Sequence, residues 1–160
     1  MRVFVTGAKG FIGKNLIQAL KRLDDIIIIE FDKEDSLSDI DEALSSVDFI
    51  FHLAGINRPE RVSEFYEGNS DLTSELLRMI SRKNKKIPVL MTSSTQVERD
   101  NDYGRSKLKA ENFLNEYSAE HSVPVYIYRL PNVFGKWSRP DYNTVIATWC
   151  HNIASGNDIR

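Results

Sequence analysis

The sequence predicts an α/β fold in which a parallel sheet carries helices on both faces. Three observations indicate this class. Short apolar runs rich in β-branched residues alternate with patterns of helical periodicity, a glycine-rich turn joins the first run to the first helix, and no repeat or flexible linker interrupts the alternation. A length of 160 residues suits one domain with a full hydrophobic core.

The strand runs are short and largely apolar. They cover Arg2–Thr6, Ile26–Phe31, Phe49–Leu53, Pro88–Ser93 and Val125–Arg129. The second run is so apolar that we expect both of its faces to be covered. The proline that leads the fourth run is tolerated at the start of a strand.

Apolar residues recur at three- and four-residue spacing between these strands, which predicts helices. The predicted helices cover Phe11–Arg22, Ser38–Ser46, Arg61–Lys83, Tyr103–His121 and Asn143–Ser155, with Gly156 ending the last one. Right-handed crossovers then give a doubly wound, three-layer α/β/α sheet of the Rossmann type, with strand order 2-1-3-4-5. Ligands of such sheets bind at the carboxyl ends of the strands, where the chain switches direction.

Composition and charge exclude several classes of protein. The net charge is −2 and no basic face stands out, so we expect no nucleic-acid partner. No apolar run is long enough to cross a membrane, and the three histidines lack metal-ligand spacing, so neither a membrane nor a metal site is expected. The single cysteine, Cys150, is expected to be buried. It allows no intrachain disulfide, and this favours a reducing compartment, the cytoplasm.

A glycine-rich segment joins the first strand to the first helix. It reads Thr6-Gly7-Ala8-Lys9-Gly10-Phe11-Ile12-Gly13. Gly7 permits the turn, Gly10 lets the backbone approach a pyrophosphate, and Gly13 lets the helix pack against the strand. The helix N-terminus at Phe11 and Ile12 adds free N–H groups. A glycine triplet alone is equally consistent with a packing turn, but its place between a strand and a helix predicts a dinucleotide-binding loop.

The residues after the second strand should meet the adenosine ribose of such a dinucleotide. They are Asp32 and Lys33. An acid there hydrogen-bonds the 2′-hydroxyl of NAD, whereas a lysine pairs with the 2′-phosphate of NADP. The pair leaves the choice of cofactor open, and a solvated turn is the alternative.

Tyr103 and Lys107 lie four residues apart at the start of a predicted helix and therefore share one face. A nearby lysine can lower the pKa of a tyrosine toward neutrality, which suits proton transfer. The pair alone is close to chance in a sequence with six tyrosines. Ser94, at the carboxyl end of the fourth strand, makes the combination specific, although such hydroxyls also serve as helix caps. These three residues are the predicted catalytic group.

Several segments together resemble the extended short-chain dehydrogenase/reductase family, which includes nucleotide-sugar epimerases, dehydratases and reductases. They are Thr6–Gly13, His52-Leu53-Ala54-Gly55, Ser94, Tyr103 with Lys107, and Arg129-Leu130-Pro131-Asn132-Val133-Phe134-Gly135. The segments His52–Glu60, Tyr126–Trp137 and Asn143–Thr148 are similar to the capsular polysaccharide synthesis enzyme F family, bacterial reductases that form UDP-N-acetyl-6-deoxy-talosamine.

The resemblance implies a role for each matching residue. Tyr103 is the proton donor, Lys107 holds the nicotinamide ribose, and Ser94 polarises the substrate keto group. Leu53, Ala54 and Gly55 line the cofactor. Asn132 lies near the substrate diphosphate, and Arg58 reaches the sugar nucleotide or is a solvated loop residue.

Three departures from the family pattern accompany the resemblance. The segment between Asp32 and Asp48 has room for one short helix, so the family's extra strand and its adenine clamp are expected to be missing. The loop between Ser94 and Tyr103 is short. Residues 1–160 correspond to the NAD(P)-binding domain, and the chain is expected to stop before the substrate domain and the cupin domain.

The resemblance implies NAD(P)H-dependent reduction of a UDP-linked keto-deoxyhexose, with NADP(H) favoured and NAD(H) as the alternative. A nucleotide-sugar epimerase or dehydratase is the second hypothesis, although Thr95-Gln96 replaces the Asp-Glu pair of 4,6-dehydratases. A dinucleotide-binding chain without activity is the third. The family also implies a homodimer formed through Arg61–Lys83 and Tyr103–His121. The apolar side chains of the second helix cannot all face one sheet, so some apolar surface should remain for a partner; they are Leu108, Phe113, Leu114 and Tyr117.

Overall fold

The computed structural model describes residues 1–159, with Leu37 described by its backbone alone. The chain forms two compact units. Met1–Arg129 holds nearly the whole sheet and five of the labelled helices, and Leu130–Arg160 holds the last helix.

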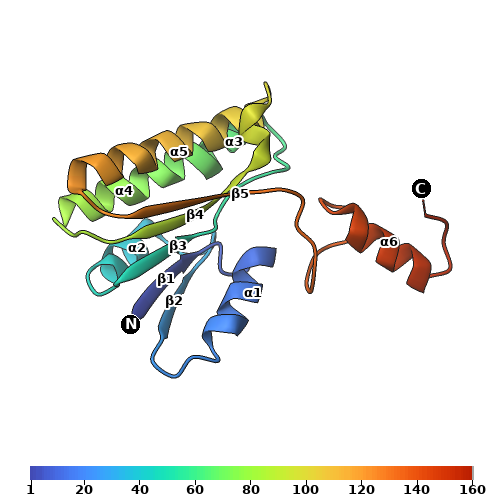
Figure 1. Cartoon of the computed structure of the whole chain (residues 1–160), viewed down its shortest axis with the longest axis horizontal. Coiled ribbons are helices and arrows are strands. Elements are labelled where there is room, and N and C mark those ends of the chain that lie inside the picture. Colours follow the sequence, from blue (N-terminus) through green and yellow to red (C-terminus); the bar gives the residue numbers. More distant parts are fainter. Residues whose placement is uncertain (160) are drawn as a thin grey trace. The chain divides into compact units, whose positions relative to one another are not determined.

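A five-stranded sheet forms the centre of the first unit (Figure 1). Its strands are β1 Arg2–Thr6, β2 Ile27–Phe31, β3 Phe49–His52, β4 Val89–Ser94 and β5 Val125–Leu130. They lie in the order β2-β1-β3-β4-β5, and the β1–β2, β1–β3 and β3–β4 pairs are parallel. This confirms the predicted fold class and strand order.

The helices fall close to their predicted places. They are α1 Phe11–Leu20, α2 Leu37–Leu44, α3 Ser63–Phe65, α4 Leu72–Arg82, α5 Asp102–His121 and α6 Val145–Ala154. The long helix expected over Arg61–Lys83 is interrupted, because a π-helical segment, Tyr66–Asp71, separates α3 from α4. A short 3-10 turn, Thr95–Glu98, leads from β4 toward α5.

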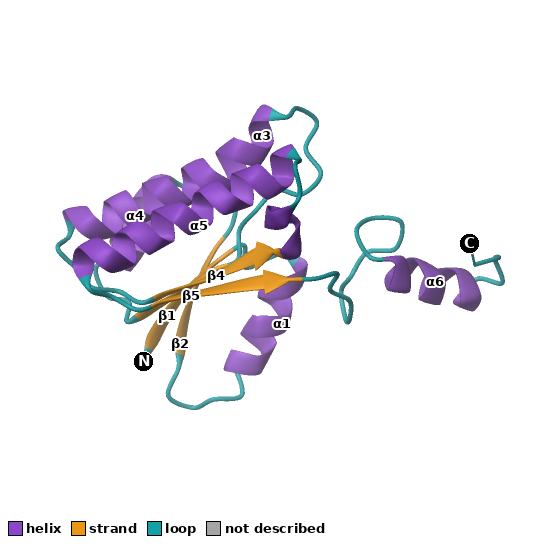
Figure 2. Ribbon diagram, turned by 45° about the horizontal axis from the view of Figure 1, so that its top comes forward, coloured by secondary structure: helices purple, strands orange, loops and turns teal. Residues whose placement is uncertain are grey.

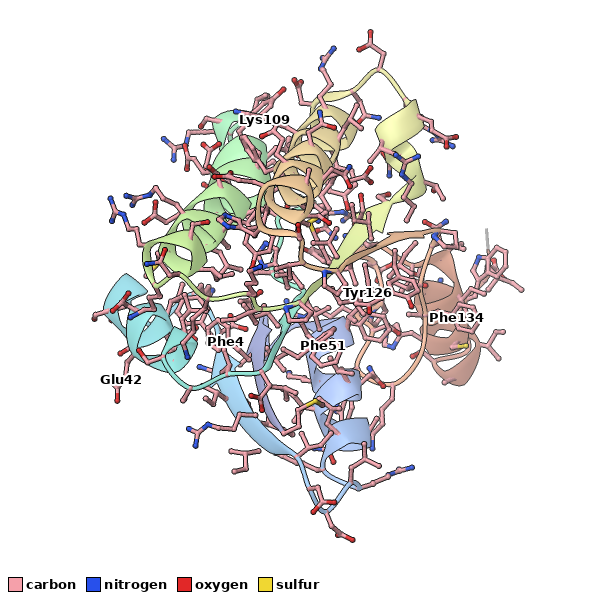
Figure 3. All side chains as sticks on the ribbon, turned by 60° about the vertical axis from the view of Figure 1, so that its left-hand side comes forward. Phe4, Glu42, Phe51, Lys109, Tyr126 and Phe134 are labelled. Carbon is pink, nitrogen blue, oxygen red and sulfur yellow. The ribbon has the colours of Figure 1, made fainter. Side chains whose placement is uncertain are left out.

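Alternation along β1 divides the core between the two faces of the sheet. Val3 and Val5 pack on the α1 side, whereas Phe4 packs on the side of α2, α4 and α5. Figure 2 shows α4 and α5 side by side over one face and α1 on the other. Figure 3 labels Phe4 and Phe51, which belong to these two clusters respectively. The sheet is therefore covered as a three-layer fold requires.

Two local expectations about burial are wrong. β2 is an edge strand, so Ile27 is 56% exposed instead of covered on both faces. Cys150 is exposed on α6, since no residue of that helix is buried. On α5 the apolar residues do not all face the sheet, as expected: Leu114 and Tyr117 are buried in the core of their own chain, whereas Leu108 is exposed.

Candidate active site

Three strand ends meet at one edge of the sheet. The register pairs Thr6 of β1 with Phe31 of β2 and with His52 of β3. The segments that leave these strands therefore start from neighbouring positions. They are the glycine loop, the Asp32–Lys33 turn and the Leu53–Gly55 segment, which are the predicted cofactor-binding residues.

The glycine loop is closed too tightly for side chains at two positions. Gly7 has φ +68°, and a Cβ atom on it would lie 2.7 Å from the backbone nitrogen of Ala54. A Cβ atom on Gly13 would lie 2.2 Å from the carbonyl oxygen of Gly7. The Gly10 N–H donates to that same carbonyl oxygen at 3.0 Å. These contacts hold the start of α1 against the end of β1.

The N-terminus of α1 suits an anion. Its N-cap residue, Gly10, makes no side-chain capping hydrogen bond, and the first turn contains no acidic residue. The first N–H groups of a helix lack partners within the helix and lie at its positive dipole end. The backbone at Phe11 and Ile12 therefore fits the pyrophosphate of a dinucleotide.

Asp32 is tied to the glycine loop. Its Oδ2 atom accepts the backbone N–H of Lys9 at 2.7 Å, and its Oδ1 atom accepts the backbone N–H of Lys33 at 2.9 Å. Lys9 in turn forms an exposed ion pair with Glu34 at 2.7 Å. The side chain of Lys33 is exposed at the same edge. Both residues of the predicted ribose-binding turn thus border the loop.

Tyr103 lies in the first turn of α5, which Asn101 caps. The Asn101 Oδ1 atom accepts the backbone N–H of Gly104 at 2.7 Å. Burial raises the pKa of Tyr103 above its usual value, and a hydrogen bond with the Ser94 side chain opposes that rise. The expectation that Lys107 lowers the pKa of Tyr103 is therefore wrong for this arrangement, because desolvation is the dominant effect.

Lys107 is 5% exposed. Burial lowers its pKa to about 8, and the Glu111 carboxylate acts in the opposite direction. A Cβ atom on Gly55 would lie 3.4 Å from the Lys107 Nζ and 2.8 Å from the Asn69 Oδ1. The lysine amine is thus brought to the segment predicted to line the cofactor.

Asn69, in the π-helical segment, was missed by the sequence argument. Its Oδ1 atom accepts the backbone N–H of Ile56 at 3.0 Å. Its Nδ2 group donates to the Ile56 carbonyl at 3.0 Å and to the Ser106 Oγ at 2.9 Å. Ser106 donates to the Tyr103 carbonyl at 2.8 Å. Asn69 therefore joins the Gly55–Ile56 segment to the helix that carries Tyr103.

His52 is the second residue that the sequence argument left without a role. It is 1% exposed, and burial, followed by the charge of Lys107, lowers its pKa to about 3. Its Nδ1 lies 2.8 Å from the Thr6 Oγ1, and its Nε2 lies 2.9 Å from the Thr73 Oγ1. Since Thr73 donates its hydroxyl to the Asn69 carbonyl at 2.7 Å, it must accept from the histidine.

The tautomer of His52 follows from these partners. Nε2 carries the proton, and Nδ1 accepts the hydroxyl of Thr6, whose oxygen accepts the Ala54 N–H at 3.2 Å. A neutral histidine thus links the Ala54 backbone to Thr73 and the helical layer. Sequence spacing gives no sign of this role, because the two partners of His52 come from two other elements, β1 and α4.

Arg58 is exposed in the loop after Ile56, and Asn132 belongs to the second unit. Among residues 1–159, no cluster of three acidic, histidine or cysteine side chains is placed to hold a metal ion. Within the same range, no helix is long and apolar enough to cross a membrane.

Comparison with known proteins places this geometry in context. The chain is 52% identical over 153 residues to a UDP-2-acetamido-2,6-beta-L-arabino-hexul-4-ose reductase of Pseudomonas aeruginosa, a match that covers 96% of this chain and 41% of that protein. The structure of the capsular polysaccharide assembling protein CapF from Staphylococcus aureus matches with a TM-score of 0.86 and 46% identity, over 100% of this chain and 43% of that one. This chain spans about two fifths of both relatives.

A more distant structure shares the fold. The UDP-glucuronic acid 4-epimerase from Bacillus cereus, solved in complex with NAD, matches with a TM-score of 0.86 at 20% identity and covers 99% of this chain and 64% of that one. The model of the NAD dependent epimerase/dehydratase family matches residues 3–160. With the glycine loop, the parallel sheet and Tyr103 with Lys107 all in place, the chain belongs to the NAD dependent epimerase/dehydratase family.

Proposed function

We propose that this chain is the dinucleotide-binding part of an enzyme that reduces a UDP-linked keto-deoxyhexose with NAD(P)H, in the synthesis of a capsule or surface polysaccharide precursor. The observation that carries the proposal is the convergence of Ser94, Tyr103 and Lys107 at the sheet edge that also holds the glycine loop. The 52% identity to the Pseudomonas aeruginosa reductase supports the substrate class.

Each of the three residues Ser94, Tyr103 and Lys107 has its own proposed role in the reduction. When bound, the nicotinamide supplies the hydride that reduces the keto carbon. Tyr103 donates the proton to the keto oxygen, and its raised pKa keeps the hydroxyl protonated near neutral pH, as a donor requires. Ser94 polarises the same oxygen by hydrogen bonding. Lys107 holds the nicotinamide ribose from its place beside Gly55.

NADPH is the proposed cofactor, with NADH binding more weakly. Both carboxylate oxygens of Asp32 already accept backbone N–H groups of the loop and turn, whereas the Lys33 amine is exposed toward solvent. A lysine at that place pairs with a 2′-phosphate. The pyrophosphate is assigned to the backbone of Gly10–Gly13, and Leu53, Ala54 and Gly55 line the cofactor.

Substrate binding and assembly extend the proposal. Arg58 and Asn132 are assigned to the nucleotide-sugar, and two copies are proposed to associate through α4 and α5. Leu108 and the partly buried Phe113 supply the apolar surface for that contact. A single cysteine, which allows no intrachain disulfide, supports action in the reducing cytoplasm.

Turnover of UDP-sugars with NADPH and NADH tests the proposal. The complete protein should oxidise NADPH only when a UDP-linked keto-deoxyhexose is added. Interconversion of UDP-sugars without net NADPH loss would favour the epimerase alternative. Cofactor binding without turnover of any keto sugar would favour a dinucleotide-binding chain.

A further inference from the structure

Glu111 lies on α5 one turn beyond Lys107 and two turns beyond Tyr103, so the three side chains share one helix face. It is 3% exposed. A carboxylate buried this deeply requires hydrogen bonds or an opposite charge to offset its desolvation. The structure supplies such partners for Glu111 from two strands, β4 and β5. Neither Glu111 nor these partners have a role in the proposed mechanism.

Arg129 and Ser93 hold the Glu111 carboxylate from the carboxyl ends of β5 and β4. The Arg129 guanidinium donates from Nε to Oε1 at 3.0 Å and from Nη2 to Oε2 at 2.7 Å. The Ser93 hydroxyl donates to Oε1 at 2.6 Å. Bidentate pairing of this kind fixes orientation as well as charge. Ser93 directly precedes Ser94, so the same carboxylate holds the strand end that presents the proposed catalytic serine.

Glu111 also affects the protonation of Lys107. Burial lowers the pKa of Lys107, and Glu111 raises it. His52 faces Lys107 from β3 and is neutral, because burial and the charge of Lys107 depress its pKa. Glu98 pairs with Arg129 at 3.6 Å but is 76% exposed. Glu111 is thus the buried negative charge that offsets Lys107.

We infer that Glu111 is a positioning residue of the site: held by Arg129 and Ser93, its carboxylate keeps Lys107 cationic and fixes the end of β4 that carries Ser94. The inference rests on the proposed function, since it assigns Lys107 to the cofactor. It goes beyond that function by giving the ion pair between the buried Glu111 of α5 and the partly exposed Arg129 of β5 a role in positioning the site.

Direct titration of Lys107 in the complete protein tests the inference. The lysine Cε resonances are followed by NMR after ¹³C labelling, and Lys107 is assigned by loss of its signal in Lys107→Arg. Glu111→Gln keeps the shape but removes the charge, so the Lys107 midpoint should fall by about one unit or more. Glu116→Gln, an exposed glutamate on the same helix, should leave it unchanged. An unchanged midpoint in Glu111→Gln would overturn the inference.

Arg129→Gln covers the case in which Glu111→Gln does not fold, because Arg129 is partly exposed. In Arg129→Gln the Glu111 carboxylate no longer pairs with the guanidinium, so its negative charge acts more strongly on Lys107. The midpoint of the Lys107 titration should therefore rise. A midpoint that stays at the wild-type value would contradict the inference.

Cofactor binding separates this inference from the proposed function. NADPH affinity should weaken as pH rises through the Lys107 midpoint, and in Glu111→Gln that loss should begin at lower pH. A loss at the same pH in both proteins counts against the inference. A wild-type protein that binds neither NADPH nor NADH would contradict the proposed function, while the Lys107 midpoint would still decide the role of Glu111.

Discussion

The Asp32 Oδ2 atom accepts the backbone N–H of Lys9 at 2.7 Å, which ties the end of β2 to the middle of the glycine loop. The hydrogen bond is charge-assisted and fixes the loop that is proposed to hold the pyrophosphate. We therefore expect Asp32 to support binding of both dinucleotides through the loop, and Lys33, exposed beside it, to distinguish them through the 2′-phosphate.

Lys33→Ala should weaken binding of NADPH much more than binding of NADH, because only NADPH carries the 2′-phosphate. We expect a loss of about tenfold for NADPH, equivalent to about 1.4 kcal/mol. Nicotinamide fluorescence titrations of both cofactors measure it. Asp32→Asn is the contrasting variant and should weaken both cofactors together. If Lys33→Ala discriminates as the wild type does, Lys33 is solvated surface and the ribose contact belongs to Asp32.

Gly13→Ala should destabilise the protein and abolish dinucleotide binding. The added Cβ would meet the Gly7 and Ala8 carbonyl oxygens at 2.2 and 2.8 Å, so backbone must move. Overpacking of this kind costs about 1–3 kcal/mol. Chemical denaturation and NADPH titration give the two readouts. Gly156→Ala, where nothing lies within 4 Å of the new Cβ although φ is +70°, is the control for the cofactor readout and should retain cofactor binding. Normal NADPH affinity in Gly13→Ala would exclude the loop from the binding site.

Acidification should destabilise the protein through His52. Burial lowers its pKa from 6.5 to about 3, so the neutral form is favoured in the folded state. The corresponding stability is present above pH 6.5 and is lost as the pH falls from there toward 3, to a total of about 4–5 kcal/mol. His52→Asn removes the titration, so the difference in unfolding free energy between wild type and variant should shrink as the pH falls.

Urea denaturation from about pH 8 to about pH 4 measures this difference, with the exposed His151→Asn as the matched control. A constant difference between wild type and His52→Asn over that range would mean that His52 is not held neutral. In that case the tautomer assigned from Thr6 and Thr73 would also fail.

The strand order and the glycine loop could be predicted because they depend on local signals. Alternation of strands and helices and the right-handed crossover determine the order β2-β1-β3-β4-β5, and a glycine triplet after a strand marks the loop. Burial of β2 could not be predicted, since an apolar run looks the same at the edge of a sheet as at its centre. Ile27 illustrates this at 56% exposure.

The supporting residues of the site could not be predicted for a related reason. Asn69 acts from a π-helical segment that helical periodicity does not reveal, and its partners Ile56 and Ser106 lie far away in sequence. Glu111 looks like an ordinary polar residue of a helix until Arg129 is placed against it by the sheet. The pKa of Tyr103 could not be predicted either. The four-residue spacing to Lys107 predicts a lowered pKa, whereas burial, which the sequence does not reveal, raises the pKa of Tyr103.

Hydride-transfer kinetics of Tyr103→Phe in the complete protein decide whether this edge of the sheet is a reductase site. The substitution removes the proposed proton donor and leaves the glycine loop, Lys107 and the ring contact with Phe65 in place. General acid catalysis contributes about 10²–10⁴-fold, so NADPH-dependent reduction of the keto sugar should slow by that factor. The NADPH dissociation constant should stay within about twofold of wild type, since the pyrophosphate is proposed to bind the loop backbone and not Tyr103. Wild-type turnover in Tyr103→Phe would contradict the proposed mechanism and leave only the dinucleotide-binding assignment.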